Sequence, residues 1–414
     1  MKIWVVGIGE PLPLDGNIDR LHRCGLLNEI LTNMGEEVVW WTSTFNHFSK
    51  KHLYNKNTTI NLKNNYKIEL LHGIGYKKNI SINRIWNHIQ IANQFKKLSK
   101  NYEKPDIIFC AFPSIELASS TVRYAISNKI PIVIDVRDLW PDIFLNVTPN
   151  ILKYITKLFL FKYFKMTKFI FSNSTSITGI TNGIVDWGIS YANRKKNKSD
   201  KTFYLGYNNE FNDLGLTKQA KKIWNDIGIS ENNFIISYVG ALAKNKINLD
   251  PIFNSAEYFK ENSNIKFVIA GEGDDKQYFI NQSNGLNNII FPGWINKYQI
   301  KSLLEISKLG LVPINNRIDY MLSIPNKPIE YIAFKLPLLS SLEGELKSLI
   351  ETEDIGFYYN SVNGLIKIIE KLHNDSKLLE EKKNNCKKVF EKYFNSKIVY
   401  NNLAQYLQNR VSNN

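Results

Sequence analysis

A single carboxylate, Glu330, stands in a short segment whose residue types suit ligand binding. Pro325 and Pro328 bracket an Asn-Lys turn just before it, and an apolar helix is predicted to begin at this turn. The first amides of a helix suit a phosphate, and a carboxylate accepts hydrogen bonds from hydroxyl groups. The segment therefore predicts a site for a phosphorylated, hydroxyl-bearing ligand, and a glutamate that caps the helix is an equally good interpretation of the segment alone.

Glycines and lysines follow other predicted strands in the second half of the chain. Gly240 closes the apolar run Phe234–Val239, Lys244 and Lys246 precede the next predicted helix, and a Gly-Glu-Gly sequence at 271–273 ends another strand. Lysines beside a helix start form a plausible diphosphate site, although a lone loop glycine is more typical of a simple turn. The repeated placement at strand carboxyl ends favours a ligand site, because open parallel sheets bind ligands at that edge.

The first half carries a charged pair after a predicted strand. Arg137 and Asp138 follow the run Pro131–Val136 in the sequence DVRDLWPD. They could act on a substrate, and a structural ion pair is the alternative. His47 lies in the loop Trp41–Tyr54, whose aromatic and basic residues without helical periodicity could order around a substrate, although a lone histidine is more often structural.

Short apolar runs between helical patterns predict the elements that must position these residues. Such runs, buried on both faces, are typical of parallel sheets with crossover helices. Because 414 residues exceed the size of a single core, two doubly wound α/β domains are expected, with Asn193–Lys201 as the linker and two amphipathic helices after Asp375. The predicted strands are Ile3–Ile8, Glu37–Trp41, Asp106–Phe109, Pro131–Val136, Phe169–Ser172, Phe234–Val239, Ile265–Ala270, Asn288–Phe291, Leu309–Pro313 and Pro337–Ser340.

The formal charge of +15 is concentrated in the first half of the chain. Residues 1–200 hold 27 Lys and Arg against 15 Asp and Glu, and residues 201–414 hold 26 against 23. This excess predicts an anionic partner, such as a phosphorylated substrate or an anionic membrane surface. Nucleic acid is not expected, because the sequence has no zinc-finger spacing, aromatic-basic sheet motif or basic zipper.

The composition favours a cytoplasmic protein. The first apolar run is too short for a secretory signal, and no stretch reaches about 18 uninterrupted apolar residues. The three cysteines, Cys24, Cys110 and Cys386, lie far apart without metal-ligand spacing, which suits a reducing compartment. No metal site is expected.

One basic and apolar segment, residues 151–171, could bind a membrane surface. No acidic residue occurs between Asp142 and Asp186. At helical spacing most of the lysines in the segment share one face, opposite Leu, Ile and Phe, which predicts an interfacial helix on anionic lipid. An ordinary packing helix with a basic outer face is the alternative. The lysines are Lys153, Lys157, Lys162, Lys165 and Lys168.

The second half resembles the nucleotide-sugar domain of the retaining glycosyltransferases of family 4, whose GT-B fold has two facing Rossmann-like domains. In that family a strand ending in Val-Gly precedes a helix with a diphosphate-contacting lysine, which Gly240 and Lys246 match. Of the family's two glutamates, Glu330 matches the second, which binds the ribose, and Leu322 stands in place of the first. An arginine that often follows the glycine is replaced by Ala241.

The first half resembles the remainder of this fold over essentially its whole length. The segment EPLPLDGNIDRLHRCGLLNEILTNMGEEVVWWT is similar to the family's opening strand, glycine loop and first helix, and DVRDLWPD is similar to a segment that faces the interdomain cleft. The expected domains are an acceptor domain, 1–195, a nucleotide-sugar domain, 202–385, and a C-terminal helix, 386–414, that returns to the first domain.

The resemblance and the residue types together give a set of expected site residues. Lys246, Arg137 and Asp138 are expected to be catalytic, and His47 and Arg20 to contact the acceptor. Backbone around Ser323–Asn326 is expected to replace the first acid against the donor sugar. The nucleotide-sugar site is expected to comprise Gly16, Asn17, Gly240, Lys246, Glu272, Ser323, Asn326, Lys327 and Glu330.

The resulting expectation is a retaining glycosyltransferase, cytoplasmic and peripheral on the inner face of a bacterial plasma membrane. It would move a hexose or an N-acetylamino sugar from a nucleotide diphosphate sugar, expected to be a UDP-sugar, to a lipid-linked saccharide of capsule, O-antigen or exopolysaccharide. No metal or other cofactor is expected for the chemistry. A soluble acceptor is the first alternative, and a non-catalytic saccharide-binding protein and a sugar-nucleotide epimerase are alternatives of another class.

Overall fold

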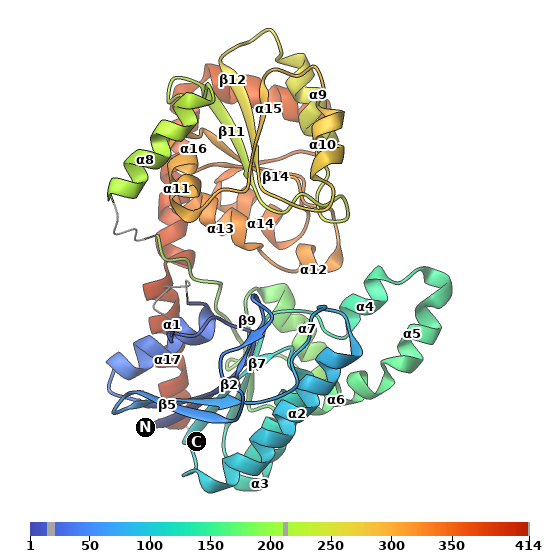
Figure 1. The fold of residues 1–414 in the computed structure, drawn as a ribbon, viewed down its shortest axis with the longest axis vertical. Coiled ribbons are helices and arrows are strands. Elements are labelled where there is room, and N and C mark those ends of the chain that lie inside the picture. The colour runs from blue at the N-terminus through green and yellow to red at the C-terminus, as the bar shows by residue number, and fades with distance from the viewer. Residues whose placement is uncertain (15–20, 210–213, 413–414) are drawn as a thin grey trace. The chain divides into compact units, whose positions relative to one another are not determined.

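A computed structural model of the chain describes residues 1–14, 21–209 and 214–412. The chain divides into two compact units (Figure 1): unit 1 comprises Met1–Gly206 and Ser396–Asn414, and unit 2 comprises Tyr207–Asn395. Each unit is built on one largely parallel sheet with crossover helices. The predicted pair of doubly wound α/β domains is confirmed.

Unit 1 contains, within the described residues, an eight-stranded sheet in which neighbouring strands run parallel except β5 and β6. Residues 45–52 add a separate short hairpin, β3 (Phe45–Asn46) and β4 (Lys51–His52). In spatial order the strands of the sheet are β10 (Lys201–Thr202), β9 (Ser176–Gly179), β8 (Ile132–Val136), β7 (Ile107–Phe112), β1 (Lys2–Val6), β2 (Glu37–Ser43), β6 (Tyr66–Leu71) and β5 (Thr58–Lys63).

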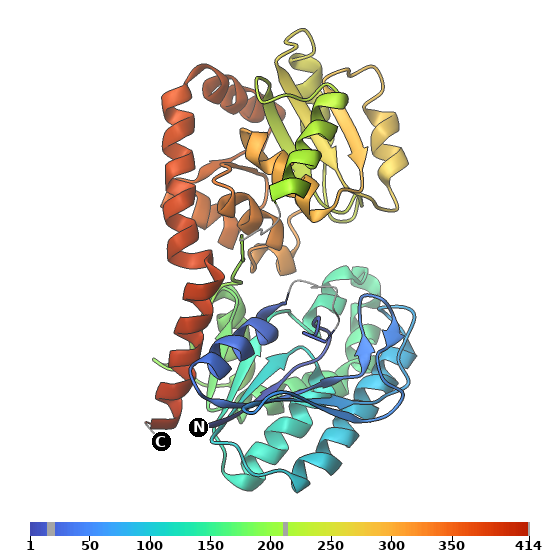
Figure 2. The same cartoon turned by 60° about the vertical axis from the view of Figure 1, so that its left-hand side comes forward.

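The helices of unit 1 include one from the far end of the chain, α17 (Ser396–Ser412), which packs against α1 (Arg23–Asn33) (Figure 2). Tyr400, Leu403 and Leu407 of α17 are buried in the core of unit 1, so the predicted return of the C-terminal helix is confirmed. The other helices of unit 1 are α2 (Ile82–Leu98), η1 (Ser99–Asn101), α3 (Ile115–Asn128), α4 (Asp142–Val147), η2 (Asn150–Leu152), α5 (Lys153–Phe159), α6 (Phe161–Ser172) and α7 (Asn182–Ala192).

Unit 2 contains, in its described part, a six-stranded sheet that is parallel throughout. In spatial order its strands are β13 (Ile289–Gly293), β12 (Ile265–Ala270), β11 (Phe234–Val239), β14 (Leu309–Val312), β15 (Leu338–Ser340) and β16 (Gly356–Tyr358). Its helices are α8 (Leu214–Asp226), α9 (Asp250–Tyr258), α10 (Lys276–Gln282), α11 (Lys297–Ile306), α12 (Ile318–Met321), α13 (Asn326–Ala333), α14 (Glu345–Glu353), α15 (Val362–Asn374), α16 (Ser376–Val389) and the π-helical turn η3 (Phe390–Phe394).

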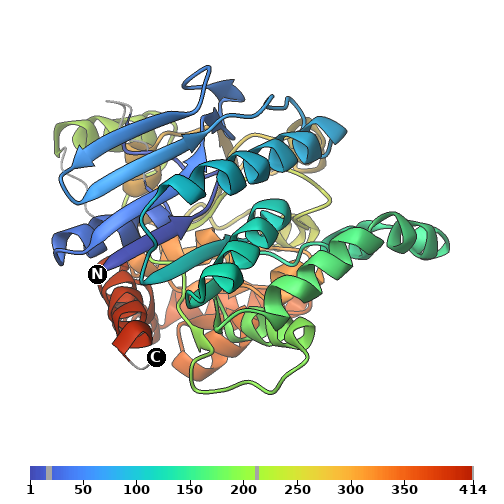
Figure 3. The same cartoon turned by 90° about the horizontal axis from the view of Figure 1, so that it is seen from below.

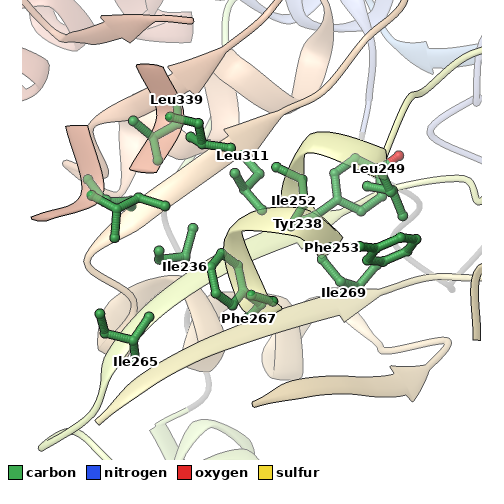
Figure 4. Packing of buried hydrophobic residues seen from close by; sticks show 14 of the residues in the cluster. Ile236, Tyr238, Leu249, Ile252, Phe253, Ile265, Phe267, Ile269, Leu311 and Leu339 are labelled. Carbon is green, nitrogen blue, oxygen red and sulfur yellow. The ribbon is translucent and has the colours of Figure 1, made fainter. Parts of the chain in front are cut away.

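The core of unit 2 forms where α9 lies on the central strands (Figure 4). Ile252 and Phe253 of α9 pack with Ile236, Phe267 and Leu311 from three different strands. Removal of this apolar surface from water stabilises the sheet by about 25 cal/mol per Å² buried. The packed core holds the sheet in place, so the loops that follow its strands start from fixed positions at its carboxyl edge.

The predicted strand Phe169–Ser172 is wrong, because these residues end helix α6. Ile170 and Phe171 are fully buried, and α6 packs against α3 and α7. A short apolar run does not distinguish a buried helix from a buried strand. The strand of this region is β9, which begins four residues later and is less apolar in composition.

The predicted linker Asn193–Lys201 belongs to unit 1. Asp200 is buried, accepts a hydrogen bond from the amide of Ile177 at 2.9 Å and pairs with Arg194 at 2.6 Å, and strand β10 follows directly. The chain instead passes to unit 2 after Gly206 and returns to unit 1 at Ser396. The first boundary thus lies after the expected 195–202, because Asp200 and Arg194 fix this segment to unit 1. The second lies after the expected 385, because α16 belongs to unit 2.

A buried ion network holds the centre of unit 1. Arg23, fully buried, forms two hydrogen bonds of 2.8 Å with Asp135, whose Oδ2 also accepts from Arg137 Nε at 2.9 Å. Arg137 pairs further with Glu10. Burial alone would raise the pKa of Asp135, but the charges of Arg23 and Arg137 hold it below its ordinary value.

Substitution Asp135→Asn should destabilise unit 1 by about 3–5 kcal/mol, because Arg23 would keep its charge in the core without a carboxylate. The loss should shrink below pH 4, since a group with a lowered folded pKa stabilises above its ordinary pKa and loses that contribution as the pH falls. Urea unfolding at several pH values measures both effects. The control Asp186→Asn breaks an exposed pair with Lys196 and should cost less than about 1 kcal/mol; equal losses in the two variants would contradict the role of the network.

Candidate functional site

The carboxyl ends of β11 and β12 bring two loops of unit 2 into backbone contact. The amide of Gly240 donates to the carbonyl oxygen of Ala270 at 3.0 Å, and the amide of Leu242 donates to that of Glu272 at 3.0 Å. Gly271 has a φ of 147°, and a Cβ at this position would lie 1.8 Å from the carbonyl oxygen of Gly240. The paired glycines therefore serve close loop packing, and they fix the start of the lysine-bearing loop.

Lys246 is exposed on this loop and has no carboxylate partner in the part of the chain that the structure describes. Its backbone is fixed, since its carbonyl oxygen accepts from the amide of Asn315 at 2.9 Å. Lys244 differs: its Nζ lies 3.5 Å from a carboxylate oxygen of Asp275 and 4.1 Å from the centroid of the Tyr278 ring. Of the two lysines, Lys246 is the one available to an anionic ligand.

Glu330 lies in the second turn of α13, and its carboxylate is buried. It accepts hydrogen bonds from the Tyr207 hydroxyl at 2.8 Å and from Lys327 Nζ at 2.6 Å. No side chain caps α13, so the capping interpretation of Glu330 is wrong. The two partners fix the position of a carboxylate that retains lone pairs for a further donor.

Helix α13 is fastened to the sheet by the residue after Glu330. The hydroxyl of Tyr331, a fully buried side chain, accepts a hydrogen bond from the amide of Val239 at 2.8 Å. Its ring lies so close to β14 that a Cβ at Gly310 would approach it to 2.5 Å. These contacts hold α13 against the carboxyl end of β11, the strand that leads to Lys246.

Other expected residues of the donor site lie on the segments beside α13. The Ser323 hydroxyl donates to a carbonyl oxygen of α12 at 2.7 Å, and Asn326 is exposed at the first position of α13. Leu322 ends α12. Glu272 is exposed, and a hydrogen bond from Lys276 lowers its pKa. Gly16, Asn17 and Arg20 lie outside the described residues.

Unit 2 also has a polar cavity of about 290 Å³ that the sequence did not indicate. It lies where β14, β15 and β16 end, and Asn315, Asn316, Ser341 and Asn360 contribute to its lining. Amides and hydroxyls of this kind are suited to hydrogen bonds with a neutral polar ligand. The asparagines that line this cavity are scattered along an asparagine-rich chain, so the sequence did not indicate that they would lie together.

Unit 1 has a polar cavity of about 290 Å³ at the carboxyl edge of its own sheet, and His47 and Asp138 both line it. The Nδ1 atom of His47 lies 2.6 Å from the Tyr76 hydroxyl. Burial, together with the positive charges of Lys50 and Arg84, lowers the pKa of His47 to about 4. The imidazole is therefore neutral near pH 7 and can accept or donate a hydrogen bond.

Arg137 does not line this cavity, although it follows the same strand as Asp138. Its guanidinium is held by Glu10 and Asp135, and its Nη2 lies 3.1 Å from Cys24 Sγ. The structural alternative for Arg137 is the one that these contacts favour, with Asp135 rather than Asp138 as its partner. Arg137 can affect the cavity only indirectly, by fixing the carboxyl end of β8, from which Asp138 follows.

Sequence reasoning missed several residues around these sites. Tyr207, the partner of Glu330, lies in the segment GYNN, which has no periodicity. Tyr76 and Arg84 come from the irregular segment between β6 and α2 and from the first turn of α2. The mixture of aromatic and basic residues in GYKKNISINR was the one signal that could have indicated them.

The basic segment 151–171 is divided into two helices at Leu160. Helix α5 has no buried residue, and Figure 1 and Figure 3 show it at the outer end of unit 1, beside α4 and α6. Ile151, Tyr154 and Phe159 are each more than 80% exposed, beside the exposed lysines Lys153 and Lys157. Helix α6, by contrast, buries Thr167, Ile170 and Phe171 and is a packing helix with Lys165 and Lys168 on its outer side.

The described residues contain neither a membrane-spanning helix nor a metal-binding group. None of their helices has the length and apolar character needed to span a membrane. No group of three or more His, Cys, Asp or Glu side chains in this part of the chain is placed to hold a metal ion.

Comparison with known proteins finds similarity to glycosyltransferases. Residues 219–389 match the family model "Glycosyl transferases group 1". Alpha-monoglucosyldiacylglycerol synthase of Acholeplasma laidlawii is 20% identical over 166 residues, and the match spans 39% of this chain and 40% of that relative.

Solved structures are similar over both units. The Anabaena protein Alr3699/HepE in complex with UDP has a TM-score of 0.66 at 13% identity, covering 99% of this chain and all of the other. An alpha,alpha-trehalose 6-phosphate synthase of Burkholderia multivorans has a TM-score of 0.63 at 10% identity, covering 99% and 98%. At these identities the likeness shows the fold, which is GT-B.

Proposed function

We propose that this protein is a retaining glycosyltransferase that moves a sugar from a UDP-sugar to a lipid-linked saccharide during synthesis of a bacterial surface polysaccharide. The observation that carries the proposal is the carboxyl edge of unit 2. There, inside the segment that matches the family model, an exposed Lys246 without a described carboxylate partner accompanies a buried, fixed Glu330. The UDP and UDP-glucose bound by the Anabaena structures support the choice of nucleotide.

The donor is held by its nucleotide end in this proposal. The Glu330 carboxylate, oriented by Tyr207 and Lys327, accepts hydrogen bonds from the ribose hydroxyls. The first amides of α13, near Ser323 and Asn326, face the donor with their positive dipole. Such contacts are the same in the ground state and the transition state, so they set substrate affinity more than the chemical step.

The chemical step is departure of the diphosphate. As the bond to the sugar breaks, negative charge grows on the phosphate oxygens, and Lys246 neutralises it at the position where it develops. The proton of the acceptor hydroxyl passes to the departing phosphate, so that no separate base is required. Asp138 and the neutral His47 line the acceptor cavity, and Arg137 holds its wall.

Two observations support an acceptor in a membrane. Helix α5 exposes aromatic and aliphatic side chains beside lysines, the combination that binds anionic lipid surfaces. The Acholeplasma relative is by name a synthase of a glycolipid. On this basis we propose that the protein acts at the inner face of the plasma membrane.

A soluble acceptor is the second candidate, since trehalose-phosphate synthases are among the structural neighbours. A non-catalytic saccharide-binding protein is the candidate of another class, because Leu322 and Ala241 replace two charged residues of the family pattern. Incubation with radiolabelled UDP-, GDP- and dTDP-sugars and anionic membrane vesicles separates them. We expect label in the lipid phase; label in a soluble product supports the second candidate, and binding without transfer or hydrolysis supports the third.

Substitution Lys246→Ala should lower kcat/KM by roughly 10²- to 10³-fold, since one donor to the developing charge is lost. The fall should be mostly in kcat, and initial rates of UDP release measure it. Lys244→Ala is the matched control, because the ammonium group of Lys244 already faces Asp275. Equal losses for the two lysines would contradict a specific role of Lys246.

Substitution Glu330→Gln should weaken binding of the nucleotide by about 1.5–3 kcal/mol, the usual contribution of hydrogen bonds to a charged group. Calorimetric titration with UDP measures the change, and unfolding without nucleotide separates it from any loss of stability. Glu351→Gln, at an exposed position on α14, is the control. Unchanged affinity in a folded Glu330→Gln variant would remove the ribose assignment.

Simultaneous substitution of Lys153, Lys157 and Lys165 by Gln should weaken vesicle binding by about 3 kcal/mol, at about 1 kcal/mol per lysine near an anionic surface. Sedimentation with phosphatidylglycerol vesicles at low salt measures the partition coefficient. Transfer to a short-chain soluble acceptor should not change. The triple control Lys377, Lys387 and Lys388 removes the same charge from exposed positions on α16. If the Lys153, Lys157 and Lys165 variant pellets as well as the control, the surface formed by α5 and the outer side of α6 does not bind the membrane.

A further inference from the structure

Two cavities of opposite character adjoin in unit 1. The polar cavity of His47 and Asp138 shares three lining residues, Arg84, His88 and Trp140, with a second cavity of about 460 Å³. The second cavity lies between the start of α2, α4 and the helices α5 and α6. Its apolar lining includes Ile80, Ile82, Ile85, Phe144, Phe159 and Leu160.

The apolar side chains at the mouth of this second cavity are left in water. Ile80 is 78% exposed, Ile82 is 82% exposed and Phe159 is 81% exposed. Large apolar side chains gathered in this way on one surface mark a binding site more often than a solvent-facing one. A hydrocarbon is the ligand that would cover them.

The wall between the two cavities carries Arg84, a cation that has no carboxylate partner among the described residues. The Arg84 guanidinium lies 4.8 Å from the Trp140 ring centroid and 5.6 Å from that of Tyr76, and it donates to the carbonyl oxygen of Asn79 at 2.8 Å. No carboxylate of the described residues pairs with it, and its buried Nε has no acceptor among them. Arg84 is therefore held in place by aromatic rings with hydrogen-bonding capacity to spare.

A second cation reinforces the first. Lys50 Nζ lies 4.9 Å from the same Tyr76 ring and donates to the side chain of Asn79 at 2.5 Å. Burial and the charge of Arg84 lower the pKa of Lys50, as they lower that of His47. The acidic groups at these cavities are Asp138, on the polar side, and Glu116, which pairs with His88 at 3.5 Å and accepts from the Tyr163 hydroxyl. Among the described residues, Arg84 and Lys50 thus have no carboxylate as an ion-pair partner.

We infer that the two cavities form one amphipathic site for a phosphate that carries a hydrocarbon chain. The phosphate lies against Arg84, which lines both cavities, with the charge of Lys50 nearby on the Tyr76 ring, and the chain enters the apolar cavity beside Phe159. Charge complementarity fixes the phosphate, and the apolar lining fixes the direction of the chain. The inference rests on the proposed lipid-linked acceptor and names its linker as an anionic phosphate, with the saccharide on the His47 side.

Calorimetric titration of the full chain tests this inference without donor or transfer. The probes are hexyl, octyl and decyl phosphate below their micelle concentrations, inorganic phosphate, and neutral decyl maltoside. We expect affinity to rise with chain length, by up to about fourfold for each buried methylene. Inorganic phosphate and decyl maltoside should each bind at least tenfold more weakly than decyl phosphate.

Three variants locate the site. Arg84→Met should weaken decyl phosphate at least tenfold, while Arg317→Met, which also removes an arginine stacked on a tyrosine but one already paired with Asp319, should not. Thr156→Trp places a large ring in the apolar cavity from the exposed helix α5, and should abolish the dependence on chain length while leaving inorganic phosphate unaffected.

The inference is overturned by any of three results. These are no binding of decyl phosphate at millimolar concentration, equal affinity for decyl phosphate and decyl maltoside, or an unchanged chain-length dependence in Thr156→Trp. Transfer from a UDP-sugar by a protein that fails this titration would remove the inference and leave the proposed function. If the protein binds decyl phosphate but never transfers sugar, the amphipathic site would stand and the proposed function would be removed.

Discussion

Parallel strands place all their carboxyl ends at one edge of a sheet, and this constraint decides where both units can hold a ligand. In unit 2 the loops after β11 and β12 approach so closely that only glycine fits at position 271. The amide of Val239 at the end of β11 bonds to Tyr331, which fixes α13 and with it Glu330. The lysine loop and the carboxylate helix therefore depend on the same strand end.

Two groups of charged residues differ in whether they have an ion-pair partner. Arg23, Asp135, Arg137 and Glu10 are buried and satisfied by one another, and a buried network of this kind holds the fold because removal of one member leaves an unpaired charge. Lys246 and Arg84 have no carboxylate among the described residues. Cations that remain unpaired in fixed surroundings are suited to anionic ligands, and both lie on segments that follow or face the carboxyl edge of their sheet.

Much of this architecture could be predicted from the sequence, because buried parallel strands leave a plain signal. The runs Phe234–Val239 and Ile265–Ala270 coincide with β11 and β12. The turn before Glu330 indicated a ligand site and a helix cap equally, and the structure excludes the cap. The strand expected at Phe169–Ser172 failed because a four-residue apolar run has no period that separates helix from strand.

The residues that sequence reasoning missed depend on contacts between distant segments. Arg84 becomes a candidate binding residue only because Trp140 and Tyr76, from other segments, lie against it. Tyr207 becomes one only because its hydroxyl reaches Glu330 on α13. The exposure of α5 is of the same kind, since an apolar face predicts burial or a lipid surface with equal strength until the packing is known. Hydrophobic periodicity in the sequence predicts helices and strands. A site formed by residues from distant segments can be identified only when the folded structure is known.

The most direct measurement is the thermal unfolding of the intact protein with UDP, GDP, dTDP and their sugar conjugates. A ligand that binds the folded state at 100 times its Kd stabilises it by about 2.7 kcal/mol, so a specific nucleotide gives a clear upward shift of Tm. We expect UDP and a UDP-sugar to raise the Tm of unit 2, with a smaller shift in Lys246→Ala. Absence of a shift with every nucleotide at millimolar concentration would contradict this expectation.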